Sequence, residues 1–314
     1  MSGEPRSGPF KVMVKRALRT GAVGEAVRTI AALRGRSLVL VFHRVAPNEP
    51  SGHGVIPVTP SDVFRRQVEA LAEVGEIRPL EVLLEDRDRH ARPRFALTFD
   101  DDFVTHVDHV LPILRTIDAP ATFFLSGRAL FGLGSYWFEL LDRLIGSRGV
   151  DEVSRLLHIR GEGVDALITA CERDPMLWKI IETEVADTPG HLGRRSIEAL
   201  ADAGMAIGFH TLRHQILTQL AESDLEAALT EGRGELEEIV GRPLLHFAYP
   251  HGKADRRTAD KVRDVGYVAA WTGRPQPMWR RSDRYLLGRW EPGPLDVDRF
   301  LVGVAVTLTR GEHR

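Results

Sequence analysis

Strand-like and helix-like segments alternate along most of this chain, and this alternation constrains the fold more than any other feature of the sequence. Short apolar runs typical of buried strands occur at residues 37–45, 95–99, 121–127, 206–210, 244–250 and 267–273. Most of them are followed by apolar residues at helical spacing, as in residues 61–75. Strands and helices in this order predict a parallel sheet connected by helices. With 314 residues, 43% of them hydrophobic, the chain can enclose one large core.

Residues 131–190 interrupt the alternation. The segments WFELLDRLI, VDEVSRLL, VDALITACERD and MLWKIIETEV all have helical patterns, so we predict a helical insertion between two strands. Beyond it, residues 222–241 read as one long polar helix. The predicted organisation is a basic helical segment at 1–36, a main domain at 37–300 and a C-terminal tail at 301–314.

The charge balance excludes some classes of protein. A formal net charge of -2 lacks the basic surface expected of a nucleic-acid-binding protein. The single cysteine, Cys171, rules out internal disulfides and fits a reducing compartment. No stretch is apolar enough for a signal peptide or a membrane span, so we expect a cytoplasmic protein.

The first 36 residues are locally basic, with eight Lys or Arg residues against Glu4 and Glu25. A helix with this composition can lie on an anionic membrane surface, which would make the protein peripheral to the inner face of the membrane. The alternative is a solvated helix packed on the outside of the main domain, and Gly21 and Gly24 favour it because they weaken a continuous amphipathic helix.

Polar residues capable of catalysis follow several of the predicted strands. They are His43, Asp100, Asp101, His210, His214, Tyr249, Pro250 and His251. Parallel α/β sheets and barrels place their active groups beyond the carboxyl ends of the strands, so these residues are expected to lie close together. Taken singly, the histidine pair is also typical of a surface, and an Asp-Asp-Asp run is also typical of a solvated turn.

The spacing of the histidines indicates a metal site. His210 and His214, four residues apart, are expected on one face of a helical turn, where they can hold one divalent ion. One carboxylate would complete a set of three protein ligands and leave coordination positions open for water and substrate. The second carboxylate of the pair would then act as a base on that water.

The motifs TFDD (98–101), HTLRH (210–214) and FAYPHG (247–252), in this order, resemble the first three motifs of the polysaccharide deacetylases with a NodB-homology domain, carbohydrate esterase family 4. The resemblance covers about residues 37–300. It implies an irregular (β/α) barrel of about seven strands that hydrolyses acetyl groups on sugars with the help of one divalent metal ion. Zn(II) is the expected ion, and Co(II), Ni(II) or Fe(II) also accept such ligands.

Position by position, the resemblance implies that Asp101, His210 and His214 are the metal ligands and that Asp100 is the general base. It also implies that a backbone N–H near Tyr249 stabilises the oxyanion. The chain is similar to the subgroup in which a histidine on the first strand is the general acid, and this histidine corresponds to His43. The alternative for His43 is a strand-end histidine bonded to a carboxylate.

The sequence also departs from the family pattern. Ala248 stands where an arginine usually holds the base, and Arg289 is predicted to supply that guanidinium. Asp102 replaces a glycine and is interpreted as structural. His251 replaces an aromatic residue, and the alternatives for it are a metal or substrate role or a simple loop position. Pro250 is assigned to substrate binding.

Two tryptophans complete the predicted site. Trp271 is expected to form a wall of the acetyl pocket, and Trp137 is expected either to stack on a sugar ring or to pack inside the insertion. The leading hypothesis is removal of N-acetyl groups from an amino-sugar glycan or glycan precursor. The alternatives are a deacylase of another amide, such as a formylated sugar or a small cyclic amide, and a carbohydrate-binding relative without activity.

Overall fold

A mostly parallel, curled sheet forms the centre of the computed structural model, which describes residues 23–47, 53–85, 92–185 and 190–310. Its strands are β1 (Ser37–Phe42), β4 (Glu76–Ile77), β5 (Arg94–Asp100), β6 (Ala121–Leu125), β7 (Ala206–Phe209), β8 (His246–Ala248) and β9 (Ala269–Trp271). They lie in the order β1-β5-β6-β7-β8-β9, with β4 paired to the beginning of β5. The predicted α/β barrel-like fold is confirmed.

An extended segment, residues 287–290, lies between the two outer strands of this sheet. The N–H of Thr272, directly after β9, donates to the carbonyl of Leu287 (2.7 Å), and the N–H of Trp290 donates to the carbonyl of Val39 in β1 (2.9 Å). The segment therefore bridges β9 to β1 and curls the sheet into an irregular barrel. Its side chains are brought to the same end of the barrel as the strand termini.

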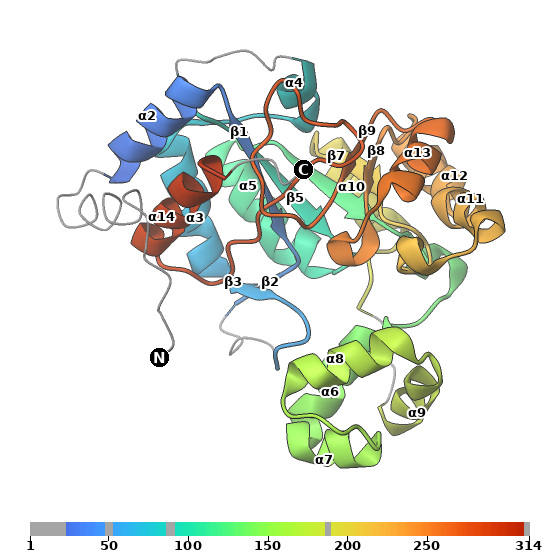
Figure 1. Cartoon of the computed structure of the whole chain (residues 1–314). Coiled ribbons are helices and arrows are strands. Elements are labelled where there is room, and N and C mark those ends of the chain that lie inside the picture. Colours follow the sequence, from blue (N-terminus) through green and yellow to red (C-terminus); the bar gives the residue numbers. More distant parts are fainter. Residues whose placement is uncertain (1–22, 48–52, 86–91, 186–189, 311–314) are drawn as a thin grey trace, which may run out of the picture.

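Most strand residues are buried, and β1, β6, β8 and β9 are buried along their whole length. All six residues of β1 are buried, and the rings of Phe42, Phe99 and Phe123, from three neighbouring strands, stack in one row at 5.6 and 4.8 Å. Helices cover the sheet from outside (Figure 1). They are α2 (Val23–Arg34), α3 (Ser61–Val74), α4 (Leu80–Glu85), α5 (Leu111–Ile117), α10 (Arg194–Asp202), α11 (Glu222–Thr230), α12 (Arg233–Val240), α13 (Arg256–Asp264) and α14 (Val297–Leu308).

Shorter elements complete the barrel. A π-helical turn, η1 (His106–Val110), leads into α5, and three 3₁₀ turns are η2 (Arg128–Phe131), η3 (Leu217–Gln219) and η4 (Pro250–Gly252). A separate parallel pair, β2 (Arg44–Ala46) and β3 (Val58–Pro60), follows β1.

The two ends of the described chain pack on each other. α2 contacts α3 and α14, and it buries Val27 and Ile30 against them, as the alternative of a packed outer helix predicts. The boundary predicted at residue 300 falls inside α14, whose apolar residues Phe300 and Val304 belong to the core. Residues 1–22, which carry most of the predicted membrane-binding charge, lie outside the described residues. Among the described residues, no helix is long and apolar enough to cross a membrane.

The helical insertion forms a group of its own beside the barrel (green in Figure 1). It contains α6 (Trp137–Arg148), α7 (Val150–Leu156), α8 (Val164–Arg173) and α9 (Met176–Glu184). A small core that includes Leu141, Leu167, Cys171 and Ile181 holds the four helices together. All four segments with a helical pattern are helices, as predicted.

The single helix predicted at residues 222–241 is wrong. The chain forms two helices there, α11 and α12, and Gly232 between them has a φ of 81°. This left-handed conformation suits glycine and ends the helical hydrogen bonding locally. The apolar periodicity continued across the break, which is why the sequence pattern concealed it.

Candidate active site

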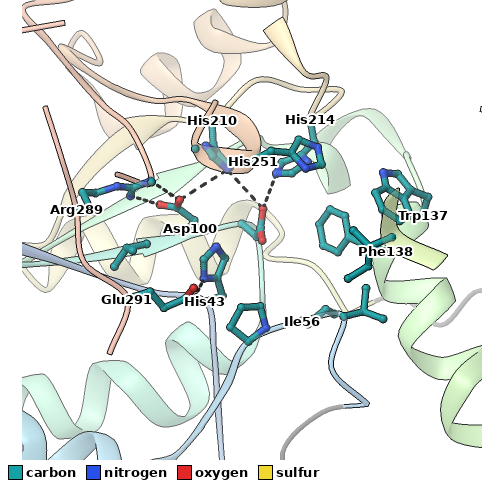
Figure 2. Close-up of a pocket in the computed structure, with 17 residues that line it drawn as sticks. His43, Ile56, Asp100, Trp137, Phe138, His210, His214, His251, Arg289 and Glu291 are labelled. Atoms are coloured by element: carbon teal, nitrogen blue, oxygen red, sulfur yellow. Dashed lines mark hydrogen bonds and ion pairs between the residues drawn. The ribbon is translucent and has the colours of Figure 1, made fainter. Parts of the chain in front are cut away.

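The predicted catalytic residues meet in one cleft of about 310 Å³ at the carboxyl ends of the strands (Figure 2). Its polar lining consists of His43, Asp100, Asp101, His210, His214, His251, Arg289 and Glu291. These side chains come from the segments that follow β1, β5, β7, β8 and β9. Residues far apart in the sequence are therefore collected at one edge of the sheet, as parallel strand order requires.

The three consecutive aspartates point to three different partners because the chain turns at the second one. Asp100 is the last residue of β5, and Asp101 has a φ of 68°, a left-handed conformation that aspartate tolerates better than most residues. Asp102 leaves the cleft and accepts hydrogen bonds from the N–H groups of Ser126 (2.8 Å) and Arg128 (3.0 Å). This geometry agrees with a structural role for Asp102.

Asp101, His210 and His214 form the group that can hold a metal ion, with ligand atoms within 4.8 Å of one another. Oδ1 of Asp101 lies 3.7 Å from Nε2 of His210 and 3.4 Å from Nε2 of His214. The expectation that the histidines share a helical turn is wrong, because Thr211 and His214 have φ values of 60° and 50° and the segment is an irregular loop. The loop nevertheless brings the two imidazole rings to a centroid distance of 5.0 Å.

The chemistry of this group fits a divalent cation. Oδ1 of Asp101 is buried and has no hydrogen-bond partner within the described chain. Burial raises the pKa of Asp101 to about 8 and lowers the pKa of His210 to about 4, so both groups resist charge where no cation compensates it. Nδ1 of His210 donates to the carbonyl of Ala248 (2.8 Å), which leaves the lone pair of Nε2 for a metal.

Asp100 is paired with Arg289, as predicted. The two guanidinium nitrogens Nη1 and Nη2 donate to the two carboxylate oxygens, each at 2.6 Å, and both side chains are almost fully buried. Burial alone would raise the pKa of Asp100, but the charge and hydrogen bonds of Arg289 lower it to about 2. Asp100 is thus ionised and fixed in orientation at neutral pH.

His43 is bonded to a carboxylate, as the alternative interpretation expects, and the partner that sequence analysis did not identify is Glu291. Nδ1 of His43 lies 2.8 Å from Oε1 of Glu291, and the two side chains are 23% and 37% exposed. Burial lowers the pKa of His43, but the carboxylates of Glu291, Asp100 and Asp101 together outweigh this effect and raise it to about 9. A signal for Glu291 was present, because it lies two residues after Arg289 and alternate residues of an extended segment share one face.

The residues predicted to bind substrate divide into two groups. His251 and Trp137 line the cleft. Tyr249, Pro250 and Trp271 are buried and lie outside the lining, so this structure does not place them in contact with a ligand in the cleft. They were predicted there because they lie at the ends of strands, but Tyr249 and Trp271 pack in the core.

The predicted oxyanion donor is a backbone N–H near Tyr249, and the hydrogen bonds of this loop narrow the choice of residue. The N–H of Tyr249 donates to the carbonyl of Trp271 (3.0 Å), so it is already engaged within the sheet. The N–H groups of Gly252 and Lys253 donate to Tyr249 and Pro250. His251, which precedes Gly252 and lines the cleft, is the remaining residue of this loop whose N–H is a candidate oxyanion donor.

Comparisons with known proteins agree with this geometry. The model of the family described as polysaccharide deacetylase matches residues 87–270, more than half of the chain. A comparison with curated proteins finds no significant match.

Solved structures share the fold at low sequence identity. The Streptococcus pyogenes deacetylase PplD in complex with acetate is 16% identical, with a TM-score of 0.62 over 88% of this chain and 99% of its own. IcaB from Ammonifex degensii is 19% identical, with a TM-score of 0.57 over 88% and 99%. A de-N-acetylase from Aggregatibacter actinomycetemcomitans is 13% identical, with a TM-score of 0.55 over 83% and 95%.

Proposed function

The chain belongs to the polysaccharide deacetylase family, and on that premise we propose that it is a metal-dependent hydrolase that removes N-acetyl groups from an amino-sugar glycan or glycan precursor. One observation carries the proposal. Oδ1 of Asp101, which is buried and has no hydrogen-bond partner among the described residues, faces the Nε2 atoms of His210 and His214 in the same cleft as the ionised Asp100. A structural cluster would have satisfied that oxygen with a hydrogen bond.

In this proposal Asp101, His210 and His214 hold one divalent ion, with Zn(II) as the first candidate. A bound ion would lower the pKa of a water molecule to about 7 and polarise the carbonyl of the substrate. Asp100 accepts the proton of the attacking water, and Arg289 keeps the carboxylate aligned for this. The N–H of His251 stabilises the negative charge that develops on the carbonyl oxygen.

His43 has the properties of the general acid. Glu291 holds Nδ1, which leaves Nε2 to donate a proton, and the raised pKa keeps the ring protonated at neutral pH. When the carbon–nitrogen bond of the amide breaks, the nitrogen takes this proton and leaves as an amine, while the acetyl carbon leaves as acetate. Asp100 thus takes a proton from the attacking water, and His43 gives a proton to the leaving nitrogen.

The acetyl group and the sugar are inferred from family membership. The names of relatives that share the fold, a deacetylase with bound acetate and a de-N-acetylase, support an N-acetylated saccharide as substrate. Action in the cytoplasm, with the basic residues 1–22 at the inner face of the membrane, remains part of this proposal.

The test is release of amine and acetate from N-acetylglucosamine oligomers by the wild type and by Asp100→Asn. We expect equal amounts of the two products from the wild type and a loss of about 100-fold or more in Asp100→Asn, since general-base catalysis contributes about that much. Metal binding without product release would redirect the search to other amides. Tight binding of oligomers without metal or product would favour a carbohydrate-binding relative.

A further inference from the structure

We propose that Glu172, on α8 of the helical insertion, is a positioning residue that holds the side chain of His251 ready to hydrogen-bond a hydroxyl group of the sugar. This inference rests on the proposed function and adds a determinant of substrate recognition to it. Its basis is a contact between the insertion and the barrel at the edge of the cleft.

Glu172 contacts two residues of the loop after β8. Its Oε1 lies 3.2 Å from Nδ1 of His251, and its Oε2 accepts a hydrogen bond from Nζ of Lys253 at 2.7 Å. The Glu172 side chain is 19% exposed and that of His251 is 13% exposed, so this contact is largely shielded from water. The insertion therefore places a charged group next to the loop that follows β8.

The ring of His251 is confined by its neighbours. Its centroid lies 4.6 Å from that of the metal-ligand candidate His214, and its plane is within 14° of the plane of Trp137, 6.4 Å away. The backbone of His251 has a φ of 57°, which fixes where the side chain leaves the chain. Figure 2 shows the ring directly beside His214 in the cleft.

One ring nitrogen remains available to a ligand. With Nδ1 directed at Glu172, Nε2 of His251 has no hydrogen-bond partner in the part of the chain that the structure describes, and the residue lines the cleft. A hydroxyl group both donates and accepts hydrogen bonds, so it can pair with this nitrogen in either protonation state. A sugar ring that carries an acetamido group at the metal site presents such hydroxyl groups close by.

Trp137 is less suited to this task, although it also lines the cleft. Its ring is stacked with Trp178 (5.9 Å, 5°) as well as with His251. These neighbours limit the ring surface that a sugar can cover. On this side of the cleft, the hydrogen bond from His251 is therefore the contact that selects the sugar, and Glu172 orients the imidazole ring that makes it.

The experiment compares Glu172→Ala, Glu172→Gln, His251→Asn and the double variant Glu172→Ala/His251→Asn in steady-state hydrolysis of N-acetylglucosamine oligomers. Gln keeps an oxygen that accepts from Nδ1, and Asn tolerates the left-handed backbone at position 251. The matched control is Glu184→Ala, which removes an ion pair with Arg148 inside the insertion (2.6 Å) and lies outside the cleft lining.

We expect Glu172→Ala to raise KM about three- to tenfold, the size of one lost hydrogen bond, with kcat changed less than about threefold. Glu172→Gln should restore most of the wild-type KM, and the double variant should be no worse than His251→Asn, because the two residues act as one unit. Glu184→Ala should match the wild type.

Two results would overturn the inference. If the wild type is active and Glu172→Ala keeps the wild-type KM, or if the effects of the two single variants add fully, Glu172 does not act through His251. If the wild type releases no amine, the proposed function fails and this inference fails with it.

Discussion

The barrel and the helical insertion both border the cleft, but they contribute different kinds of residue. The barrel supplies the proposed metal ligands, general base and general acid. They are Asp100, Asp101, His43 and the two histidines of the 210–214 loop. The insertion supplies Trp137, Phe138 and Ile168 to the wall, and Glu172 behind His251. We therefore expect catalysis to depend mainly on the barrel, and substrate recognition to depend on the wall that the insertion builds together with His251.

The way each region holds its residues supports this division. Arg289 fixes Asp100 through a buried, bidentate pair, so the reactive carboxylate has little freedom. The insertion reaches the loop after β8 through Glu172, whose ion pair with the 45% exposed Lys253 is open to solvent and contributes less to stability. Changes in the barrel should therefore alter turnover, and changes in the insertion should alter substrate affinity.

The largest effect is expected at His43. His43→Gln should lower kcat about 100-fold because the leaving amine loses its proton donor, and Glu291→Gln should lower it about tenfold because the histidine keeps a hydrogen-bond partner without a charge. Amine release at constant metal content measures both. A kcat for His43→Gln within threefold of the wild type would exclude a general acid at this position.

Asp102→Ala should destabilise the barrel by about 3 kcal/mol, because it removes the acceptor of two buried backbone N–H groups and of the Ser126 hydroxyl. Urea denaturation measures the change in the free energy of unfolding. Asp108→Ala, at an exposed position nearby, is the control and should change it by less than about 0.5 kcal/mol. A loss below 1 kcal/mol in Asp102→Ala would show that the third aspartate is not structural.

In the insertion, Trp137→Ala should raise KM for N-acetylglucosamine oligomers up to about tenfold and leave kcat within about threefold, because the residue borders the cleft without touching the reactive groups. Met176→Ala, on the exposed side of α9, is the matched control and should behave as the wild type. A selective loss of kcat in Trp137→Ala would break the division between the two regions.

The smallest effect is expected on stability, at the contact between His191 and Glu139 of α6. Nε2 of His191 contacts Oε2 of Glu139 at 2.7 Å. Burial lowers the pKa of His191, but the bond to Glu139 and the charges of Glu139 and Asp102 together raise it above its ordinary value of 6.5. A raised pKa stabilises the fold fully below pH 6.5, and this contribution disappears as the pH rises through the folded-state value. His191→Gln should therefore be about 1 kcal/mol less stable than the wild type at pH 6, with a smaller gap at pH 9. A gap that grows with pH would contradict this assignment.

The barrel was largely predictable from the sequence, because its strands are apolar runs that end in polar residues. The same pattern identifies Asp100, Asp101, His210 and His214 as candidate site residues. Backbone detail was not predictable, since the left-handed conformations of Asp101 and His214 depend on the surrounding loops.

Contacts between side chains far apart in the sequence were also not predictable from it. Tyr249 and Trp271 follow the strand pattern of cleft residues, yet the curvature of the sheet directs them into the core. Glu172 lies in a helix with no motif, and only packing of the insertion against the barrel brings it to His251. Single-sequence patterns describe local structure, and such contacts arise from tertiary packing.

The most direct test of the central claim is the metal content of the purified protein beside that of Asp101→Ala and His214→Ala, with amine release measured on the same samples. We expect about one divalent ion per chain in the wild type, lost in both variants together with amine release. Wild-type protein that releases amine without metal, or variants that keep the ion, would contradict the site described here.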